Sequence, residues 1–293
     1  ANRPPSPARH AAISNVLNNF STHVARHIVE NVFKGKLIYS GGDDVLAMVS
    51  VDDLLPAMLL LRAAYSGVGD ASWLPGGIDL KGLSLGKGFV QIGKGRDKRL
   101  MLMMGARATA SIGAVVAHHQ APLAAVLRDL RSAEKRAKDH GRNAFCLRVI
   151  KRAGGEVAVT ARFWETADQP PSLDQTALGM LMRFADTLAQ PGMSRRAVYH
   201  TTQWLEGLPR IENMERPAWE DIVTHNLAFQ LKKQADGLAE QIKEKLPDQA
   251  RHLVAAALRE SAGTADAARV LDDLLVTAEF FAREGRGLGA AEA

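Results

Sequence analysis

Residues Leu37–Leu46, Leu-Ile-Tyr-Ser-Gly-Gly-Asp-Asp-Val-Leu, place a glycine turn with two adjacent carboxylates between two short apolar segments. Apolar and β-prone residues on both sides of a glycine turn predict a β-hairpin, with strands at 37–39 and 45–49. Because both flanks are apolar, we expect the strands to be buried in a core sheet. Gly41 and Gly42 can adopt positive φ and allow a phosphate to approach bare backbone.

The acidic hairpin tip has two interpretations. Gly and Asp are common turn residues, so an ordinary turn is the first. The second is a metal and phosphate site, because Asp43 and Asp44 supply the hard oxygen ligands that Mg²⁺ or Mn²⁺ prefers. Carboxylates at the mouth of a buried sheet cost free energy unless a cation or donors meet them, which favours the second interpretation. Asp43 is the first candidate ligand and Asp44 the second, because neighbouring residues of an extended chain point to opposite faces.

A second strand-forming region follows downstream. Ala108–Ala117 predicts a buried strand, and Ala121–His140 has the apolar spacing of a helix that stops at Gly141. Phe145–Ile150 and Glu156–Phe163 predict the two strands of a hairpin across a Gly-Gly turn.

The order of these elements resembles the palm superfamily of GGDEF proteins and nucleotidyl cyclases. The motifs behind this resemblance are Gly41-Gly42-Asp43-Asp44, Ser111-Ile112-Gly113 and Ala137-Lys138-x-x-Gly141-Arg142-Asn143. Within the superfamily, the chain is more similar to the large subunit of type III-B CRISPR effector complexes. This closer resemblance covers most of residues 1–163 and depends on Ser6-Pro7-Ala8-x-His10-x-x-Ile13-Ser14, Ile38-Tyr39-Ser40-Gly41-Gly42-Asp43-Asp44-Val45-Leu46 and Ala117-His118-His119-x-Ala121-Pro122-Leu123.

The resemblance implies a nucleotidyltransferase that binds ATP and two Mg²⁺ or Mn²⁺ ions. It would join ATP into cyclic oligoadenylate when the assembled complex engages target RNA. Asp43 and Asp44 would then be the catalytic and metal-binding residues. The residues expected to bind nucleotide are Ser40, Gly41, Gly42, Ser111, Lys135, Lys138 and Asn143. Solvated lysines, and small polar residues that complete local backbone bonding, are the alternatives at these positions.

The N-terminal part departs from the palm pattern. Palms of this kind usually carry another metal-binding Asp on a strand before the first long helix, whereas Arg3-Pro4-Pro5 here precedes an amphipathic pattern from Ala11 to Val32. We therefore expect a C-terminal fragment of the subunit, and the departure puts catalysis by the fragment alone in doubt. Asp52 and Asp53 are interpreted as N-caps of a helix at 54–65.

The predicted fold class is α+β, with a ferredoxin-like palm followed by an all-α domain. The palm domain is expected at 1–165, with a glycine-rich insertion at about 67–107. A break at 166–172 marks the domain boundary, and the helical domain is expected at 173–284 before a disordered tail at 285–293. The predicted helices are Leu173–Leu188, Ser194–Leu205, Pro217–Ala235, Gln249–Ser261 and Thr264–Arg283.

Composition favours a cytoplasmic protein without a membrane partner. No apolar run reaches membrane-helix length, no signal peptide is visible, and the single Cys146 excludes an internal disulfide. Basic residues outnumber acids between 128 and 162, which predicts either phosphate contact or a solvated surface.

The implied partners are other subunits of the effector complex, with small helical subunits on the C-terminal domain, together with guide and target RNA. Two other functions stay open. One is a non-catalytic scaffold or RNA-binding module in which the hairpin turn is inert. The other, less favoured, is a diguanylate cyclase, because Asp44-Val45 stands where that family has Glu-Phe.

Overall fold

The computed structural model describes residues 6–69, 74, 78–152, 154–164, 172, 176–208 and 215–285. The chain divides into two compact units, and each is described by itself. Unit 1 is Ala1–Ala110 with Trp164–Pro170, and unit 2 is Ser111–Phe163 with Pro171–Ala293. Helices and small sheets together make an α+β protein, which confirms the predicted fold class. The predicted domain border at 165–173 falls almost wholly outside the described residues and stays a prediction.

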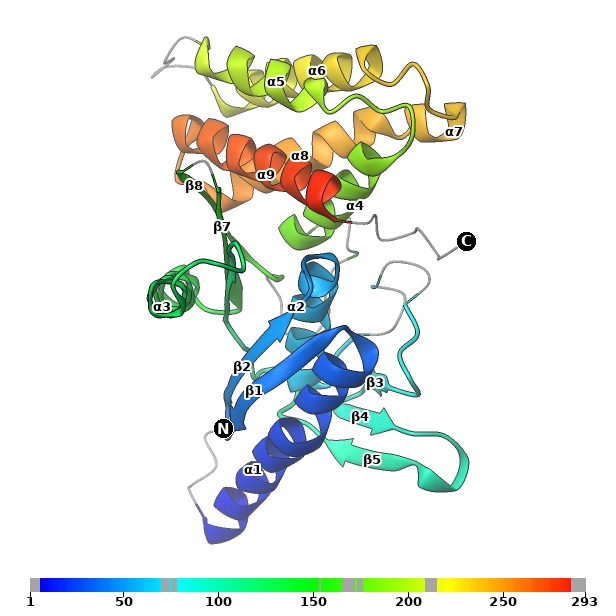
Figure 1. Cartoon of the computed structure of the whole chain (residues 1–293), viewed down its shortest axis with the longest axis vertical. Helices are drawn as coiled ribbons and strands as arrows, with labels where there is room; N and C mark the ends of the chain where they lie inside the picture. Colours follow the sequence, from blue (N-terminus) through cyan, green and yellow to red (C-terminus); the bar gives the residue numbers. More distant parts are fainter. Residues whose placement is uncertain are drawn as a thin grey trace. The chain divides into compact units, whose positions relative to one another are not determined.

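Unit 1 combines helices with two small antiparallel sheets (Figure 1). Its elements are α1 (Pro7–Asn19), the π-helical turns η1 (Phe20–Val24) and η2 (His27–Val32), β1 (Gly35–Gly41), β2 (Asp44–Val49), α2 (Val51–Ser66), β3 (Ser84–Gly86), β4 (Phe89–Ile92), the 3-10 turn η4 (Gly95–Asp97) and β5 (Arg99–Leu102). β1 pairs with β2, which confirms the predicted hairpin, and β3, β4 and β5 form a second sheet. The glycine-rich insertion therefore contains a sheet of its own.

The helix boundaries of α2 follow from local side chains. Ser50 is the N-cap, and Asp53 in the first turn accepts hydrogen bonds from Ser50 Oγ at 2.9 Å and from the Lys34 backbone nitrogen at 2.8 Å. The N-cap prediction for Asp52 and Asp53 is therefore wrong, because the serine before them already occupies the cap and the acids lie within the first turn. At the other end, Gly67 adopts φ +66°, and a Cβ there would lie 2.7 Å from the Phe89 nitrogen.

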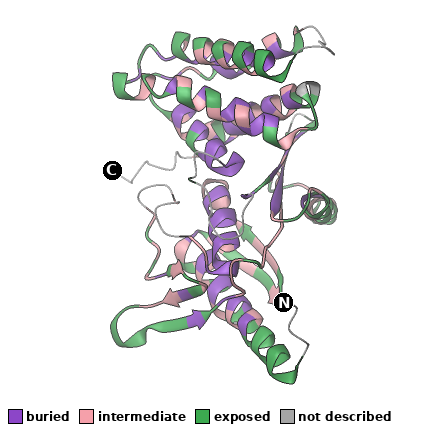
Figure 2. Ribbon diagram, turned by 180° about the vertical axis from the view of Figure 1, so that it is seen from behind, coloured by how far each residue is buried: buried purple, intermediate pink, exposed green. Residues whose placement is uncertain are grey.

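The core of unit 1 lies between α2, the π-helical turns and the inner face of the β3–β4–β5 sheet. Its buried members are Phe20, Val24, Ala25, Ile28, Phe33, Ala57, Leu60, Ala64, Tyr65, Leu83, Val90, Met101 and Met103. Figure 2 shows α2 as the most continuously buried element of this unit.

Unit 2 contains a three-stranded sheet and a set of helices. The elements are β6 (Ile112–Val116), α3 (Leu123–Asp139), β7 (Ala144–Ile150), β8 (Glu156–Arg162), α4 (Ala177–Ala189), α5 (Arg196–Glu206), α6 (Arg216–Lys233), α7 (Glu240–Lys243), α8 (Leu246–Glu260) and α9 (Thr264–Glu284). β6 runs parallel to β7, and β7 pairs with β8 in antiparallel fashion, as the Gly-Gly turn predicts. The short α7 is missed by the sequence pattern.

The crossover helix α3 packs closely on β6 because the facing residues are small. Ala133 and Ala137 of α3 are fully buried together with Ala144 and Cys146. A Cβ at Gly113 would lie 2.8 Å from the Glu134 Cα atom, so the α3 backbone occupies the place of a side chain. Glycine in the Ser111-Ile112-Gly113 motif is thus required by packing.

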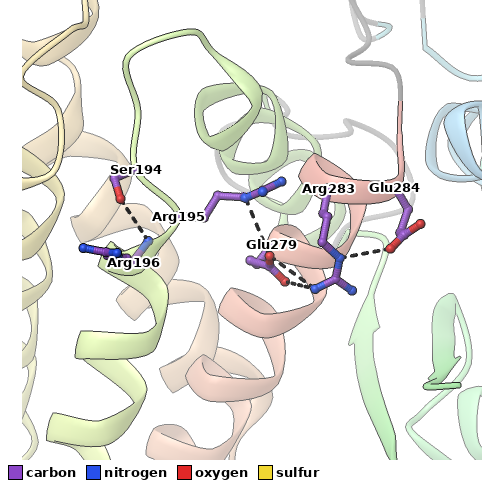
Figure 3. A network of polar contacts seen from close by, with 6 residues as sticks. All are labelled: Ser194, Arg195, Arg196, Glu279, Arg283 and Glu284. Atoms are coloured by element: carbon purple, nitrogen blue, oxygen red, sulfur yellow. Dashed lines mark hydrogen bonds and ion pairs between the residues drawn. The ribbon is translucent and has the colours of Figure 1, made fainter. Parts of the chain in front are cut away.

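A buried acid ties the helices of unit 2 together (Figure 3). Glu279 on α9 is 5% exposed, and its carboxylate lies 3.2 Å from Arg283 Nη1 and 3.8 Å from Arg195 Nε. Arg283 also pairs with Glu284 at 2.9 Å. Two guanidinium groups thus compensate the carboxylate that α9 buries.

No helix in the described part of the chain is both long enough and apolar enough to cross a membrane. Of the predicted tail 285–293, only Gly285 belongs to the described residues.

Candidate metal and nucleotide site

The acidic hairpin tip is a two-residue turn between paired strands. Ser40 pairs with Val45 and Gly41 with Asp44, which leaves Gly42 and Asp43 as the loop. Gly42 has φ +60°, as the first central position of a type II′ hairpin turn requires, and a Cβ there would meet no atom within 4 Å. The backbone at Gly42 is therefore open to a ligand.

Both acids of the tip are exposed. Across residues 6–69, 78–152, 154–164, 176–208 and 215–285, neither Asp43 nor Asp44 forms an ion pair or a hydrogen bond with a cationic side chain. Two adjacent carboxylates without a cation repel each other, and this repulsion disappears when a divalent ion bridges them.

The outer face of the tip carries an aromatic ring. A Cβ at Gly41 would lie 2.6 Å from the Tyr39 hydroxyl, so the ring of Tyr39 covers that glycine. Asp44 pairs with Gly41 across the hairpin and therefore lies beside the ring. Tyr39 as a whole is 57% exposed.

Ser40 has an unsatisfied hydroxyl. Its Oγ atom is buried and makes no hydrogen bond with the described residues, although it belongs to the strand next to the turn. Local backbone bonding, the alternative interpretation, is thus not what this hydroxyl does. The Ser40 oxygen is therefore unpaired, and a ligand would reach it only after neighbouring atoms move.

The expectation that both hairpin strands are buried is wrong. Ile38, Tyr39 and Met48 are each more than half exposed, and in the described chain β1 and β2 form a sheet of two strands. Val45 and Val49 pack against the unit 1 core, so one face of the hairpin is covered and the other is not. Burial is expected from the sequence because both faces of the hairpin carry apolar residues. Within the described residues, however, only the face with Val45 and Val49 packs against the core.

Tyr65 of α2 lies near the acidic tip, which sequence patterns do not reveal. Burial, and to a smaller extent the Asp43 carboxylate, raises the pKa of the Tyr65 phenol. Arg62, one turn earlier, donates to Ser66 Oγ at 2.6 Å and lies 4.4 Å from the centre of the Trp164 ring. Burial lowers the pKa of the Arg62 guanidinium to about 10. In the sequence, nothing distinguishes Arg62 and Tyr65 from the other residues of a predicted helix.

The remaining predicted nucleotide ligands lie in unit 2. Ile112 pairs with Phe145 in the parallel strands β6 and β7. Ser111 and Asn143 come just before these strands, so both lie at the end of the sheet where the two strands begin. Lys135 and Lys138 are exposed near the C-terminal end of α3, and Lys138 Nζ lies 2.6 Å from Glu134 Oε1. Lysines at this end of a helix also complement its negative dipole.

The segment between α3 and β7 has an unusual backbone. Gly141, Arg142 and Asn143 all have positive φ, at +93°, +62° and +47°. Non-glycine residues with such angles need surrounding contacts that hold them. The Asn143 carbonyl accepts a hydrogen bond from the Phe163 nitrogen at 2.8 Å, which fixes one end of the segment.

Glu260 of α8 fixes the other end. Its Oε2 atom lies 2.8 Å from His140 Nε2 and accepts from the Arg162 backbone nitrogen at 3.2 Å. An acid at a helix C-terminus is unfavourable for the helix dipole, so these two contacts offset that cost. Lys138 and Asn143 thus flank a segment that α8 holds in place.

A cleft of about 410 Å³ adjoins this contact within unit 2. Its charged lining residues are Arg136, Asp139, His140, Glu260, Asp266, Arg269 and Asp273. Burial, and then the neighbouring Asp272, raises the pKa of Asp273 to about 6. Opposite charges line the cleft together, and in the described part of the chain no three or more His, Cys, Asp or Glu side chains gather as a metal site.

The predicted site residues thus form two groups. Ser40, Gly41, Gly42, Asp43 and Asp44 lie together at the tip in unit 1. Ser111, Lys135, Lys138 and Asn143 lie on β6, α3 and the segment before β7 in unit 2. Their roles stay predictions.

The chain is similar to known proteins in sequence and in fold. Residues 2–146 match the second palm domain of Cas10/Cmr2. The CRISPR system Cmr subunit Cmr2 of Pyrococcus furiosus is 25% identical over 250 residues, which cover 85% of this chain and 24% of that protein. The subunit of the same name from Saccharolobus solfataricus is 32% identical over 124 residues, or 42% of this chain and 10% of that protein.

A solved structure also matches. The cryo-EM structure of the type III-B Cmr-β complex in its apo state contains a chain with a TM-score of 0.54 and 16% identity, and the match covers 87% of this chain and 26% of that one. At this identity the likeness shows the fold. The chain spans about a quarter or less of the length of these relatives. Residues 2–146 are therefore a second palm domain of the Cas10/Cmr2 family, and the chain is related to the large subunit of type III-B CRISPR complexes.

Proposed function

We propose that this palm belongs to a subunit of a type III-B effector complex and makes cyclic oligoadenylate from ATP with Mg²⁺ or Mn²⁺. The observation that carries the proposal is the exposed acid pair on an open glycine turn, without a cationic partner among the described residues. Acids kept unpaired in this way are suited to a ligand rather than to the stability of the hairpin.

The residues of the tip fit a divalent ion that binds with its substrate. Mg²⁺ is commonly held by one or two carboxylates together with substrate phosphates, and it needs no cage of protein ligands. Asp43 and Asp44 would supply those carboxylates. When bound, the ions would lower the pKa of the attacking ribose hydroxyl and neutralise the triphosphate and the departing pyrophosphate.

The chain's own residues would bind and orient the nucleotide. The open backbone at Gly42 would admit the phosphates, whereas a phosphate at Gly41 would first have to displace the Tyr39 ring. The buried Ser40 hydroxyl would donate to a nucleotide oxygen only after its neighbours move aside. In unit 2, Lys135 and Lys138 are separate candidates to offset phosphate charge, and Ser111 and Asn143 are candidate hydrogen-bond donors where β6 and β7 begin. Guide RNA, target RNA and the other subunits of the complex would be the partners.

A non-catalytic scaffold is the second candidate, and exposed side chains of the helices in unit 2 favour it. Tyr199 of α5 is 54% exposed, and Ile222 and Phe229 of α6 are 43% and 59% exposed. Exposed apolar side chains on helices suit contact with small helical subunits. In this function the acid pair would be inert.

Nucleotide synthesis by the natural full-length protein in its assembled complex separates these functions. With target RNA, ATP and Mn²⁺, Asp43→Ala combined with Asp44→Ala should reduce synthesis about 100-fold or more. Asp79→Ala is the matched control, since Asp79 is an exposed acid of unit 1 that pairs with Lys81 at 2.8 Å. Retained synthesis in the double variant refutes the proposal. A parallel reaction with GTP tests the diguanylate cyclase: preferential conversion of GTP would overturn the choice of ATP.

A further inference from the structure

The β3–β4–β5 sheet carries apolar side chains on both faces. Val90 and Met101 point into the unit 1 core and are buried. Strand residues alternate between faces, so Phe89, Leu100 and Leu102 point the other way. These three side chains are 39%, 66% and 48% exposed.

The three exposed side chains form one stripe. Phe89 pairs directly with Leu102, and Leu100 pairs with Gln91, two residues along β4 from Phe89. Directly opposed and diagonal side chains on one face of an antiparallel pair lie within contact distance. We call Phe89, Leu100 and Leu102 the outer stripe.

Such a sheet normally has a cover on each face. An antiparallel sheet with one face in water alternates apolar and polar residues, whereas residues 100–104 are Leu-Met-Leu-Met-Met without a polar break. On the outer face, Phe89, Leu100 and Leu102 stay partly exposed, although Asn19 at the end of α1 donates a hydrogen bond to the Leu102 carbonyl at 3.4 Å. Figures 1 and 2 show the β4–β5 hairpin as a projecting arm of unit 1 with an exposed end. A contiguous exposed apolar surface with a polar rim is characteristic of a protein contact.

Cations surround the end of this hairpin. Lys94, Arg96, Lys98 and Arg99 are exposed around the η4 turn, with Asp97 as the acid among them. None of these four forms an ion pair with a residue that the structure describes. The hairpin end therefore complements an acidic surface.

We propose that the outer stripe and the four cations dock a different protein subunit, through an apolar surface of that subunit with an acidic rim. A second copy of this chain would bring the same cations against each other in a symmetric contact. RNA suits the cations but not the stripe, because two of its three side chains are aliphatic and neither stack on bases nor bond to phosphate. This surface is independent of the nucleotide chemistry proposed above.

Site-specific photo-cross-linking in the assembled complex tests the partner. The natural full-length protein would carry p-benzoylphenylalanine in place of Leu100, and the control would carry it in place of Leu123, which is 67% exposed on α3. The expected result is a cross-link from position 100 to another protein subunit, with a higher yield than from position 123. A cross-link to RNA, to lipid, to a second copy or within the same polypeptide overturns the proposal, and so does equal or absent cross-linking at position 100.

Two sets of variants separate the stripe from the cations. Leu100→Ser combined with Leu102→Ser should weaken binding of the cross-linked subunit about tenfold or more at every salt concentration. Arg96→Glu combined with Lys98→Glu should weaken binding most at low salt, because the attraction between charges is screened. Both pairs alter exposed side chains, and circular dichroism checks that the fold is kept. Unchanged affinity in either set contradicts the proposal.

Discussion

Acidic residues have opposite environments at the hairpin tip of unit 1 and in the interior of unit 2. Asp43 and Asp44 are exposed and have no cation among the described residues, whereas Glu279 is 5% exposed between Arg195 and Arg283 (Figure 3). An acid that holds a fold together is paired, because burial without a cation is costly. The tip acids make no such pairing with the residues that the structure describes.

Glycines show the same difference. Gly113 faces the backbone of α3 without space for a side chain, whereas Gly42 has open space around it. Unit 2 is therefore fixed by close packing at Gly113, whereas Gly42 is kept by the conformation of its turn and not by packing.

The largest expected effect is on packing. Gly113→Ala should lower the free energy of unfolding by about 3 kcal/mol, because α3 must move away from β6. Gly42→Ala should cost only about 1 kcal/mol, since its penalty is the left-handed backbone alone. Urea unfolding of both variants measures the difference, and equal losses would contradict the contrast between packed and open positions.

The next effect concerns the acids. Glu279→Ala should lower the free energy of unfolding by about 2 kcal/mol, since two guanidinium groups lose their shared partner. Asp43→Ala with Asp44→Ala should change it by less than about 0.5 kcal/mol. Thermal unfolding checks both, and a large loss in the tip variant would show that the acids support the hairpin.

A pH dependence sharpens the comparison within unit 2. Asp273 has a folded pKa of about 6 against an ordinary value of 3.8, so its ionisation costs stability as the pH rises through this interval. Asp273→Asn should therefore stabilise the protein at pH 8 by about 1–2 kcal/mol and have little effect at pH 4. Asp248→Asn is the control, because Asp248 is 62% exposed and pairs with Arg251. A gain that does not depend on pH would contradict the assignment.

The smallest effect is local. Glu260→Ala should speed amide hydrogen exchange in residues 138–143, because His140 and the Arg162 nitrogen lose their acceptor. Glu260→Gln should restore protection, since its amide oxygen can accept both hydrogen bonds. Glu156→Gln is the matched control. Glu156 pairs with Arg148 in the same sheet but lies at the opposite end of the β7–β8 pair from this segment. Equal exchange rates in the Ala variant and the wild-type protein would show that Glu260 does not stabilise this segment.

Sequence reasoning succeeds where the cause is local. The turn at Gly42 and Asp43, the helix α3 that stops before Gly141 and the hairpin at Gly154 follow from backbone preferences of neighbouring residues. It fails where the cause is distant. The exposure of Ile38 and Met48 depends on which surfaces cover β1 and β2, and an apolar pattern does not report that.

In the candidate site, too, local features are predictable from the sequence and distant contacts are not. The adjacency of Asp43 and Asp44 is a property of the sequence, and in the structure both acids are exposed. The contact of α8 with His140 through Glu260 joins residues 120 positions apart, so no spacing rule predicts it. Nor does any local pattern indicate that Tyr65 lies near Asp43.

The most direct test of the central claim is a structure of the natural full-length protein with a non-hydrolysable ATP analogue and Mn²⁺. We predict anomalous density for Mn²⁺ at about 2.0–2.3 Å from a carboxylate oxygen of Asp43, between that residue and the triphosphate. Nucleotide and metal bound elsewhere, or an empty tip at saturating concentrations of both, would contradict the assignment.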